Sequence, residues 1–129
     1  MSLPQIALLE KIYSELVRQN TAGLQSLLPT NMTFNVAGKS SLAGKYTHET
    51  FLTEYCAKLK SGAGGNLKME IHDILASDRH ATVLLTYTVE QSGAPSQIRA
   101  VHVWRIENQQ PIAGYEYPRD MYQYDSIWK

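Results

Sequence analysis

Two polar residues near the end of the chain, His102 and Glu116, have side chains that could transfer protons. Alternation along an extended segment places His102 on the same side as the apolar residues Trp104 and Ile106. The same alternation groups Glu116 with Ile112. An imidazole and a carboxylate that both face an apolar interior can act as an acid–base pair, or they can satisfy each other's hydrogen bonds without turnover. The spacing leaves both alternatives open.

The catalytic alternative makes Glu116 the base. Desolvation in an apolar pocket would raise the pKa of Glu116 toward neutrality, where a carboxylate can remove a proton next to a carbonyl group. His102 could then orient the carboxylate or donate a hydrogen bond to an enolate oxygen. We therefore expect these two side chains to lie within hydrogen-bonding reach if the protein is an enzyme.

Two aspartates in the C-terminal segment are rival carboxylates. We expect Asp120 to be structural, either capping a turn or pairing with Arg119 or Arg105. Asp125 has the same structural interpretation. Trp128, close to the last residue, is expected to pack over a sheet edge or a partner subunit.

The aromatic residues favour types with a polar end. The chain has 8 Tyr and 2 Trp but only 2 Phe, and Tyr and Trp suit pocket walls better than a fully dry core. We expect Trp104, Tyr87 and Tyr55 to line a cavity together with Phe34 and Val36, although core packing is the alternative for each. Such a lining would suit a planar or cyclic apolar ligand.

Several function classes are disfavoured by the composition. Lys plus Arg and Asp plus Glu balance at 12 each, with no basic run, which gives no electrostatic argument for nucleic acid or an anionic membrane. The single cysteine, Cys56, excludes an internal disulfide and a cysteine-based zinc site, and we interpret it as a small buried hydrophobe. The 4 histidines are dispersed and no phosphate-binding glycine loop follows a strand, so neither a metal nor another cofactor is expected.

No targeting or membrane segment is expected. The first apolar stretch is interrupted by Glu10 and Lys11 and lacks the features of a signal peptide. No apolar run approaches the roughly 20 residues that span a bilayer. These observations predict a soluble, cytoplasmic protein.

The hydrophobic periodicity predicts an α+β domain that covers residues 1–129. The expected helices lie at 4–18, 22–28 and 47–60, and the expected strands at 31–36, 67–72, 81–89, 98–106 and 112–117. Residues 37–46 are expected to form a loop, and turns are expected at 92–95 and 108–111. Three N-terminal helices over the concave face of a strongly curved antiparallel sheet would leave a conical cavity.

Four segments carry a resemblance to a known family. They are QNTAGLQSLLPTNMTF at 19–34, AGKYTHETF at 43–51, HVWRIENQQPI at 102–112 and YPRDMYQYDSIW at 117–128. Their order resembles the NTF2-like superfamily, in its SnoaL-like branch related to polyketide cyclases and ketosteroid isomerases, over essentially the whole chain. The resemblance implies a cystatin-like, cone-shaped fold and face-to-face dimers.

The resemblance also implies roles for individual residues. In isomerase-like members a tyrosine of the first helix, here Tyr13, donates to the developing oxyanion. The isomerase base falls near Val36, and the adjacent Asn35 is no base, so a ketosteroid isomerase is not expected. In SnoaL-like cyclases the acid–base pair is a histidine of the penultimate strand and an aspartate of the last strand, positions that His102 and Glu116 occupy here.

Three hypotheses of function follow. The first is a pocket protein, possibly a cofactor-free isomerase, cyclase or dehydratase acting on a small apolar or cyclic carbonyl compound. The second is a non-catalytic ligand-binding or dimerisation module, and the third is a protein-interaction domain like the transport factor that names the superfamily. Apolar residues on the outward face of the sheet favour a homodimer. They are Leu84, Val101, Val103, Ala113, Tyr115 and Tyr117.

Overall fold

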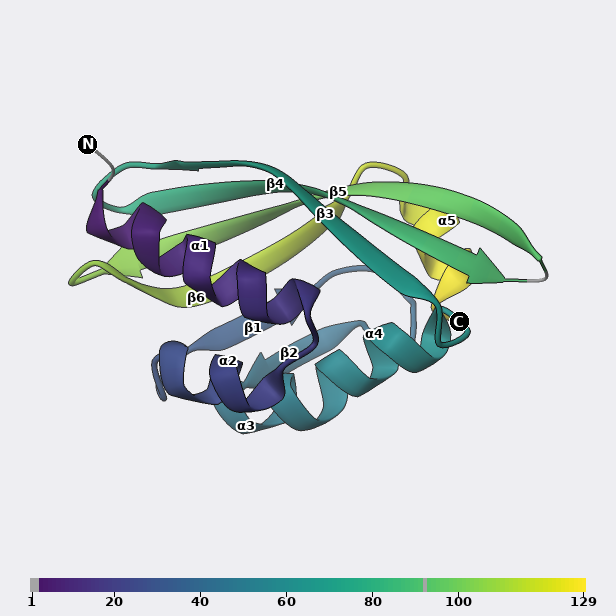
Figure 1. Ribbon diagram of the computed structural model, residues 1–129, viewed down its shortest axis with the longest axis horizontal. Helices are drawn as coiled ribbons and strands as arrows, with labels where there is room; N and C mark the ends of the chain where they lie inside the picture. Colours follow the sequence, from purple (N-terminus) through teal and green to yellow (C-terminus); the bar gives the residue numbers. More distant parts are fainter. Residues whose placement is uncertain (1–2, 92) are drawn as a thin grey trace.

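One curved sheet and a group of helices form the protein (Figure 1). The computed structural model describes residues 3–91 and 93–129, so Ser92 of the expected turn lies outside the described residues. The helical elements are α1 (Pro4–Val17), α2 (Thr21–Leu27), α3 (His48–Thr50), the π-helical segment η1 (Phe51–Tyr55), α4 (Cys56–Gly62) and α5 (Met121–Ile127). The strands are β1 (Thr33–Val36), β2 (Gly44–Thr47), β3 (Leu67–Ala76), β4 (His80–Gln91), β5 (Ala94–Glu107) and β6 (Gln110–Pro118).

The sheet is mixed rather than fully antiparallel. Its strand order is β2-β1-β6-β5-β4-β3, and β1 runs parallel to β6 while all other neighbours are antiparallel. The expected antiparallel sheet is therefore wrong at this one pair. A long connection permits a parallel pair, and here β1 meets the last strand after most of the chain has intervened. The expected loop at 37–46 is also partly wrong, because Gly44–Thr47 forms β2.

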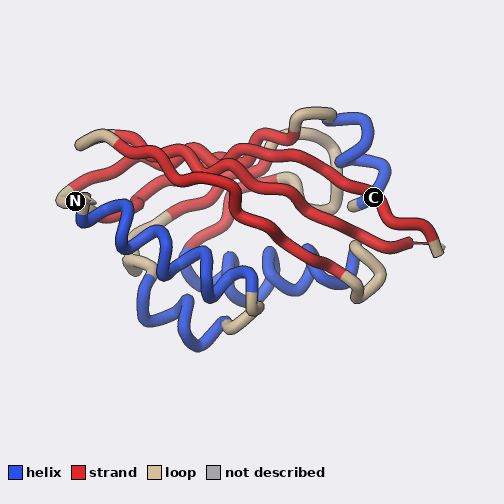
Figure 2. The backbone as a smooth tube through the Cα atoms, turned by 45° about the horizontal axis from the view of Figure 1, so that its top comes forward, coloured by secondary structure: helices blue, strands red, loops and turns tan. Residues whose placement is uncertain are grey.

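Helices α1 to α4 cover one face of the sheet, whereas α5 lies at one end of it (Figure 2). The first helix begins with Pro4 in its first turn and buries Leu9, Ile12 and Leu16 against the core. The third expected helix is present but divided into α3, η1 and α4. Thr47 caps it as expected, because its hydroxyl accepts a hydrogen bond of 3.3 Å from the Thr50 amide. The α+β cone is thus confirmed.

A fourth helical region, α5, was not expected from the sequence. Asp120 caps it, since its Oδ1 accepts a hydrogen bond of 3.2 Å from the Gln123 amide. The capping interpretation of Asp120 is therefore correct. Among the described residues, Asp120 forms no ion pair with Arg119 or Arg105.

Trp128 follows α5 and turns into the molecule rather than packing over a sheet edge. Its side chain has no exposed surface (0%), and its indole N–H donates to the Leu59 carbonyl at 2.9 Å. The Trp128 carbonyl accepts from the Ser41 amide at 2.7 Å. A Cβ at Gly62 would collide with the indole, so a glycine is needed where α4 ends beside it. The last residues thus close one end of the cone.

The described helices include none that is both long enough and apolar enough to cross a membrane.

Candidate functional site

The two residues with acid–base side chains lie opposite each other on neighbouring strands. His102 of β5 and Glu116 of β6 are direct partners in the antiparallel register. The His102 Nε2 atom lies 2.6 Å from Glu116 Oε2, and the two residues are 1% and 0% exposed. The period-two pattern in the sequence therefore brings both side chains to one place inside the cone.

The Glu116 carboxylate accepts hydrogen bonds from four side chains on four different elements. Tyr55 of η1 and Tyr124 of α5 donate to Oε1 at 3.0 and 2.5 Å. Tyr87 of β4 and His102 of β5 reach Oε2. Both oxygens are thus fully coordinated by protein groups, without surface exposure.

A second chain of hydrogen bonds extends from His102 to the first helix. The Tyr13 hydroxyl lies 2.5 Å from His102 Nδ1 and accepts a hydrogen bond from the Trp104 indole at 2.9 Å. Since an indole only donates, the Tyr13 hydrogen is free to point toward Nδ1. Because an ionised carboxylate only accepts hydrogen bonds, the His102 ring carries a proton on Nε2 and donates it to Glu116.

The pKa of Glu116 is lowered, not raised. Burial raises the pKa of the carboxyl, but attraction to His102 and hydrogen bonds from His102, Tyr124 and Tyr87 lower it below its usual value. The expectation of a raised pKa was wrong because the sequence does not reveal how many donors converge on the carboxylate.

The surrounding tyrosines keep their protons. Desolvation, followed for Tyr55 and Tyr87 by the negative charge of Glu116, raises the pKa of each phenol well above its usual value. The pKa of Tyr13 and that of Tyr124 are raised chiefly by burial as well. The site is therefore an ionised carboxylate held by neutral hydroxyl groups.

The expected pocket walls are all buried and pack around this network. Trp104, Tyr87, Tyr55, Phe34 and Val36 are 0 to 5% exposed. The Phe34 ring contacts Tyr55 and His102 edge-on, with centroids 5.0 and 5.2 Å apart. The sequence predicts that these side chains line an open cavity, but here they pack against the acid–base pair and against one another.

Two of the side chains that fill this space come from α5 and the residue that follows it. Tyr124 and Trp128 are both fully buried, with ring centroids 4.8 Å apart, and Trp128 also contacts Tyr87 at 5.6 Å. Two hollows of about 460 and 620 Å³ lie elsewhere, on the outer face of the sheet and between α1 and β3. Neither of them is lined by His102 or Glu116, although Tyr13 of the network lines the hollow between α1 and β3. The site is closed in this structure.

Sequence reasoning missed Tyr124, which makes one of the short hydrogen bonds to Glu116. A signal was present, because Asp120, Tyr124 and Trp128 recur at intervals of four residues, as on one side of a capped helix. The hydrophobic periodicity predicts no helix in this segment, and so it assigns no donor to it.

Cys56 and Asp125 have structural surroundings. Burial raises the pKa of the Cys56 thiol to about 12, which fits a packed hydrophobe rather than a nucleophile. The Asp125 carboxylate accepts from the Lys39 amide at 3.3 Å and so fastens α5 to the loop after β1. No three His, Cys, Asp or Glu side chains gather as a metal site within residues 3–91 and 93–129.

Comparisons with known proteins agree with this architecture. A family model described as the SnoaL-like domain matches residues 9–113. No curated protein sequence matches the chain significantly. An NTF2-like protein from Burkholderia pseudomallei superposes with a TM-score of 0.80 at 17% identity, over 100% of this chain and 99% of that one.

Two further solved structures bear names that refer to small molecules. TerC, co-crystallised with polyporic acid, has a TM-score of 0.83 at 15% identity, covering 97% of this chain and 98% of that one. IdmH from Streptomyces antibioticus, a proposed polyketide cyclase, has a TM-score of 0.74 at 8% identity, covering 89% and 91%. At these identities the likeness establishes the fold alone.

Proposed function

Because the chain belongs to the SnoaL-like domain family, we propose that it binds a small cyclic compound inside its cone, in the space that Tyr124 and Trp128 fill here. The observation that carries this proposal is the hydrogen bond from Tyr124 to Glu116. It places a phenol of the C-terminal helix against the buried carboxylate, and an indole beside it. We interpret these two rings as occupying the ligand's position in the closed state.

The side chains that would remain around the site after α5 moves away would determine the class of ligand. When α5 moves away, Glu116 loses one of its two donors on Oε1 and keeps Tyr55 there. A ligand hydroxyl or enol could replace the lost phenol, and a planar ring could replace the Trp128 indole against Tyr87. An ionised carboxylate disfavours anionic ligands by repulsion. The expected ligand is therefore neutral, cyclic and hydroxylated or ketonic.

The same site supports a cofactor-free proton transfer, which is the catalytic form of the proposal. With one donor fewer, the pKa of Glu116 would move up toward a range useful for a base. Glu116 would take a proton from the carbon next to a carbonyl, and the electron pair of that C–H bond would move onto the carbonyl oxygen. His102 would turn its Nε2 proton from the newly protonated Glu116 to the resulting enolate oxygen.

Tyr13 would act in this reaction through His102. Its hydroxyl is held by both the Trp104 indole and His102 Nδ1, so it is not directed at the space beside Glu116. Its role would be to fix the tautomer in which His102 carries a proton on Nε2. Returning the abstracted proton to another carbon gives an isomerisation, and attack of the enolate on a second carbonyl gives a cyclisation. Collapse of the enolate with loss of a β-hydroxyl, which leaves as water with the proton that Glu116 took, gives a dehydration.

The family and the structural relatives support the binding part of this proposal. IdmH is a proposed polyketide cyclase, and TerC was co-crystallised with polyporic acid. Their names agree with a small-molecule ligand, at identities where function does not transfer.

A non-catalytic ligand-binding module is the alternative, and the lowered pKa of Glu116 in the closed state favours it.

We also propose that the protein is a homodimer through the outer sheet face. Leu84, Val101 and Val103 are half-buried there, and Tyr115 and Tyr117 are 38% and 50% exposed.

The test compares the wild type with Glu116→Gln and with Glu107→Gln, a matched change at an exposed position of β5. Each protein is titrated with cyclic ketones and hydroxylated naphthalenes in a calorimeter, and the ketones are followed for exchange of α-hydrogen with solvent deuterium. Catalysis by Glu116 requires that exchange falls by about 10²-fold or more in Glu116→Gln and not in Glu107→Gln. Binding without exchange in the wild type would select the non-catalytic alternative. Failure of every compound to bind would refute the proposal.

A further inference from the structure

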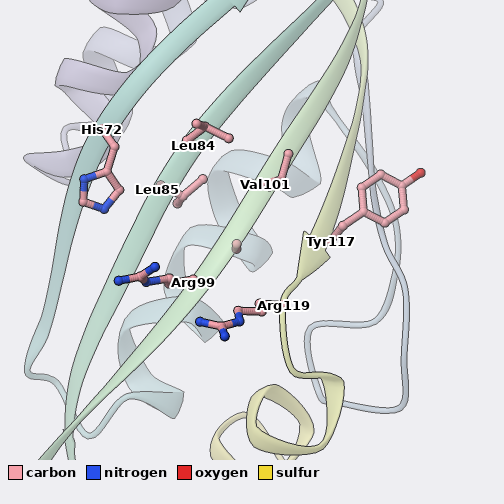
Figure 3. Close-up of a pocket in the computed structure, with 8 residues that line it drawn as sticks. His72, Leu84, Leu85, Arg99, Val101, Tyr117 and Arg119 are labelled. Atoms are coloured by element: carbon pink, nitrogen blue, oxygen red, sulfur yellow. The ribbon is translucent and has the colours of Figure 1, made fainter.

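Strand β3 forms one edge of the sheet and has one unpaired side. It is the last strand in the order β2-β1-β6-β5-β4-β3, and β4 is its one strand neighbour among the described residues. In Figure 3 it is the strand that carries His72, with β4 beside it. The opposite edge strand, β2, has 4 residues, whereas β3 has 10. A long edge strand offers unpaired backbone N–H and C=O groups to which another strand can hydrogen-bond.

The inward side chains in the first half of β3 are incompletely covered. Helix α1 faces the second half, since residues 71–74 line the hollow between the two elements. Leu67, Met69 and Ile71 are half-buried, although each is paired with a residue of β4 that is at most 1% exposed. Those partners are Val89, Tyr87 and Leu85. A strand added beside β3 would cover this apolar margin.

The outward side chains of the same segment carry opposite charges. Lys68 and Glu70 are both exposed, and on β4 they face the neutral side chains of Thr88 and Thr86. Lys68 forms no ion pair within residues 3–91 and 93–129. Glu70 lies 3.8 Å from His72 Nδ1, which is an ion pair only when the imidazole is protonated. Both charges are therefore available to a strand that approaches the edge.

Residues 67–71, Leu-Lys-Met-Glu-Ile, are complementary to a second copy of themselves. In an antiparallel pair with Met69 opposite Met69, Leu67 of each copy faces Ile71 of the other. Lys68 of each copy then faces Glu70 of the other. Residues directly opposite each other share a face of the sheet, so the apolar pairs fall on the inner face and the charged pairs on the outer face. Two-fold symmetry makes each of these pairs occur twice.

We propose that two copies of the chain join β3 to β3 in this register and form one continuous sheet. The bulge between Ile71 and Asp73 ends the regular segment, so the seam is short and the association is expected to be weak and concentration-dependent. The edge is a different surface from the outer face, which carries Leu84, Val101 and Tyr117 (Figure 3). The inference depends neither on a ligand in the cone nor on a dimer through the outer face, and each can fail alone.

The first experiment measures self-association by sedimentation equilibrium over a range of protein concentrations. All proteins carry Tyr117→Asp, which places a charge on the outer face, where Tyr117 is 50% exposed, and so removes association through that face. The variants add Lys68→Glu alone, or Lys68→Glu together with Glu70→Lys. Lys45→Glu is the matched control, because Lys45 is exposed on the opposite edge strand.

We expect a reversible dimer whose dissociation constant is unchanged by Lys45→Glu. Lys68→Glu places like charges opposite each other at two positions, and should raise the dissociation constant at least about tenfold. Exchanging both charges restores the opposite-charge pairs and should return the dissociation constant to within about threefold of its starting value. A protein that is monomeric at every concentration, an unchanged constant in Lys68→Glu, or a failure of the charge exchange to restore association would each overturn the proposal.

The second experiment tests the register by cross-linking in a Cys56→Ala background with oxidised glutathione. Met69 faces itself, with Cβ atoms about 5 Å apart, so Met69→Cys should form a disulfide-linked dimer. Lys68→Cys is the control, because residue 68 lies diagonally from its own copy, about 7–8 Å away. Equal cross-linking of both variants, or of neither, would contradict this register.

Discussion

Replacement of Trp128 by alanine tests whether α5 is the element that closes the cone. The indole is fully buried, donates to the Leu59 carbonyl at 2.9 Å and packs against Tyr87 and Tyr124. Truncating a buried tryptophan to alanine costs about 3–5 kcal/mol of folding free energy. Because domains are commonly stable by about 5–15 kcal/mol, we expect Trp128→Ala to remain folded with reduced stability.

The same substitution should strengthen ligand binding, although it weakens the fold. If the ligand replaces the α5 rings, its apparent affinity is reduced by the fraction of molecules in which α5 is displaced. Suppose that, of the folding free energy lost in Trp128→Ala, about 3 kcal/mol had kept α5 docked against the cone. The displaced fraction then rises by about 10²-fold, since each 1.4 kcal/mol is a factor of ten. The apparent dissociation constant falls by the same factor, until α5 is displaced in most molecules.

Three measurements check this prediction. Denaturant unfolding gives the loss of stability, and calorimetry with 2-naphthol gives the change in affinity. Hydrogen exchange of the Ser41 and Lys39 amides reports displacement directly, because these amides bond to the Trp128 carbonyl and the Asp125 carboxylate. The control is Tyr122→Ala, which alters a side chain of α5 that is 92% exposed and should change none of the three.

The reasoning is refuted if Trp128→Ala loses stability while the exchange of these amides and the affinity for 2-naphthol stay as in the wild type. That result would make Trp128 part of a cone that never opens. A weaker affinity in Trp128→Ala would be equally damaging, because it would mean that the ligand binds against α5 rather than in its place.

Other predictions concern the network and its surroundings. Glu116→Gln should cost about 3–5 kcal/mol of folding free energy at neutral pH, because it breaks the buried network. The folded-state pKa of Glu116 lies below its ordinary 4.5, so the ionised carboxylate stabilises the fold above that pH. The difference in stability between wild type and variant, measured by urea unfolding, should therefore shrink as the pH falls below about 4.5. A gap that widens on acidification would contradict the lowered pKa. Gly62→Ala should speed exchange of the Ser41 amide, because the added Cβ meets the Trp128 indole. Gly93→Ala strains a turn whose φ is 81° but meets nothing within 4 Å, and so it should leave the exchange of this amide unchanged. Cys56 is half-buried and has a thiol pKa of about 12, so it should react with iodoacetamide at pH 8 much more slowly than a free thiol, and labelling at the rate of a free thiol would contradict the raised pKa.

The sequence revealed the part of the site that depends on local periodicity. Strand alternation is enough to place His102 and Glu116 on the same side of neighbouring strands, and a short polar turn between them sets a register in which they meet. The helices up to α4 followed from their apolar spacing in the same way, whereas α5 did not. These features depend only on residues that are close in sequence or that face each other across one hairpin.

What could not be foreseen depends on contacts between distant segments. The parallel pairing of β1 with β6 joins strands separated by most of the chain, and no local pattern specifies it. The donors Tyr55 and Tyr124 reach Glu116 from 61 and 8 residues away, on elements whose placement is set by packing. The pKa of Glu116 depends on the sum of these donors, so the sequence could suggest its burial but not the direction of its shift.

The arrangement around Glu116 also bears on whether it serves only the fold. An ionised carboxylate with no exposed surface must recover a large desolvation cost, and an apolar side chain at such a position is often as stable or more so. Two of its donors, Tyr87 and His102, stand on central strands, whereas Tyr124 stands on a seven-residue helix at the end of the chain. Tyr55 ends a π-helical segment, a conformation that recurs at functional sites. A network built only for rigidity would gain most from donors on the sheet. Placing one donor on a short terminal helix makes the coordination of Glu116 depend on whether that helix is docked, and a ligand hydroxyl could exploit this dependence.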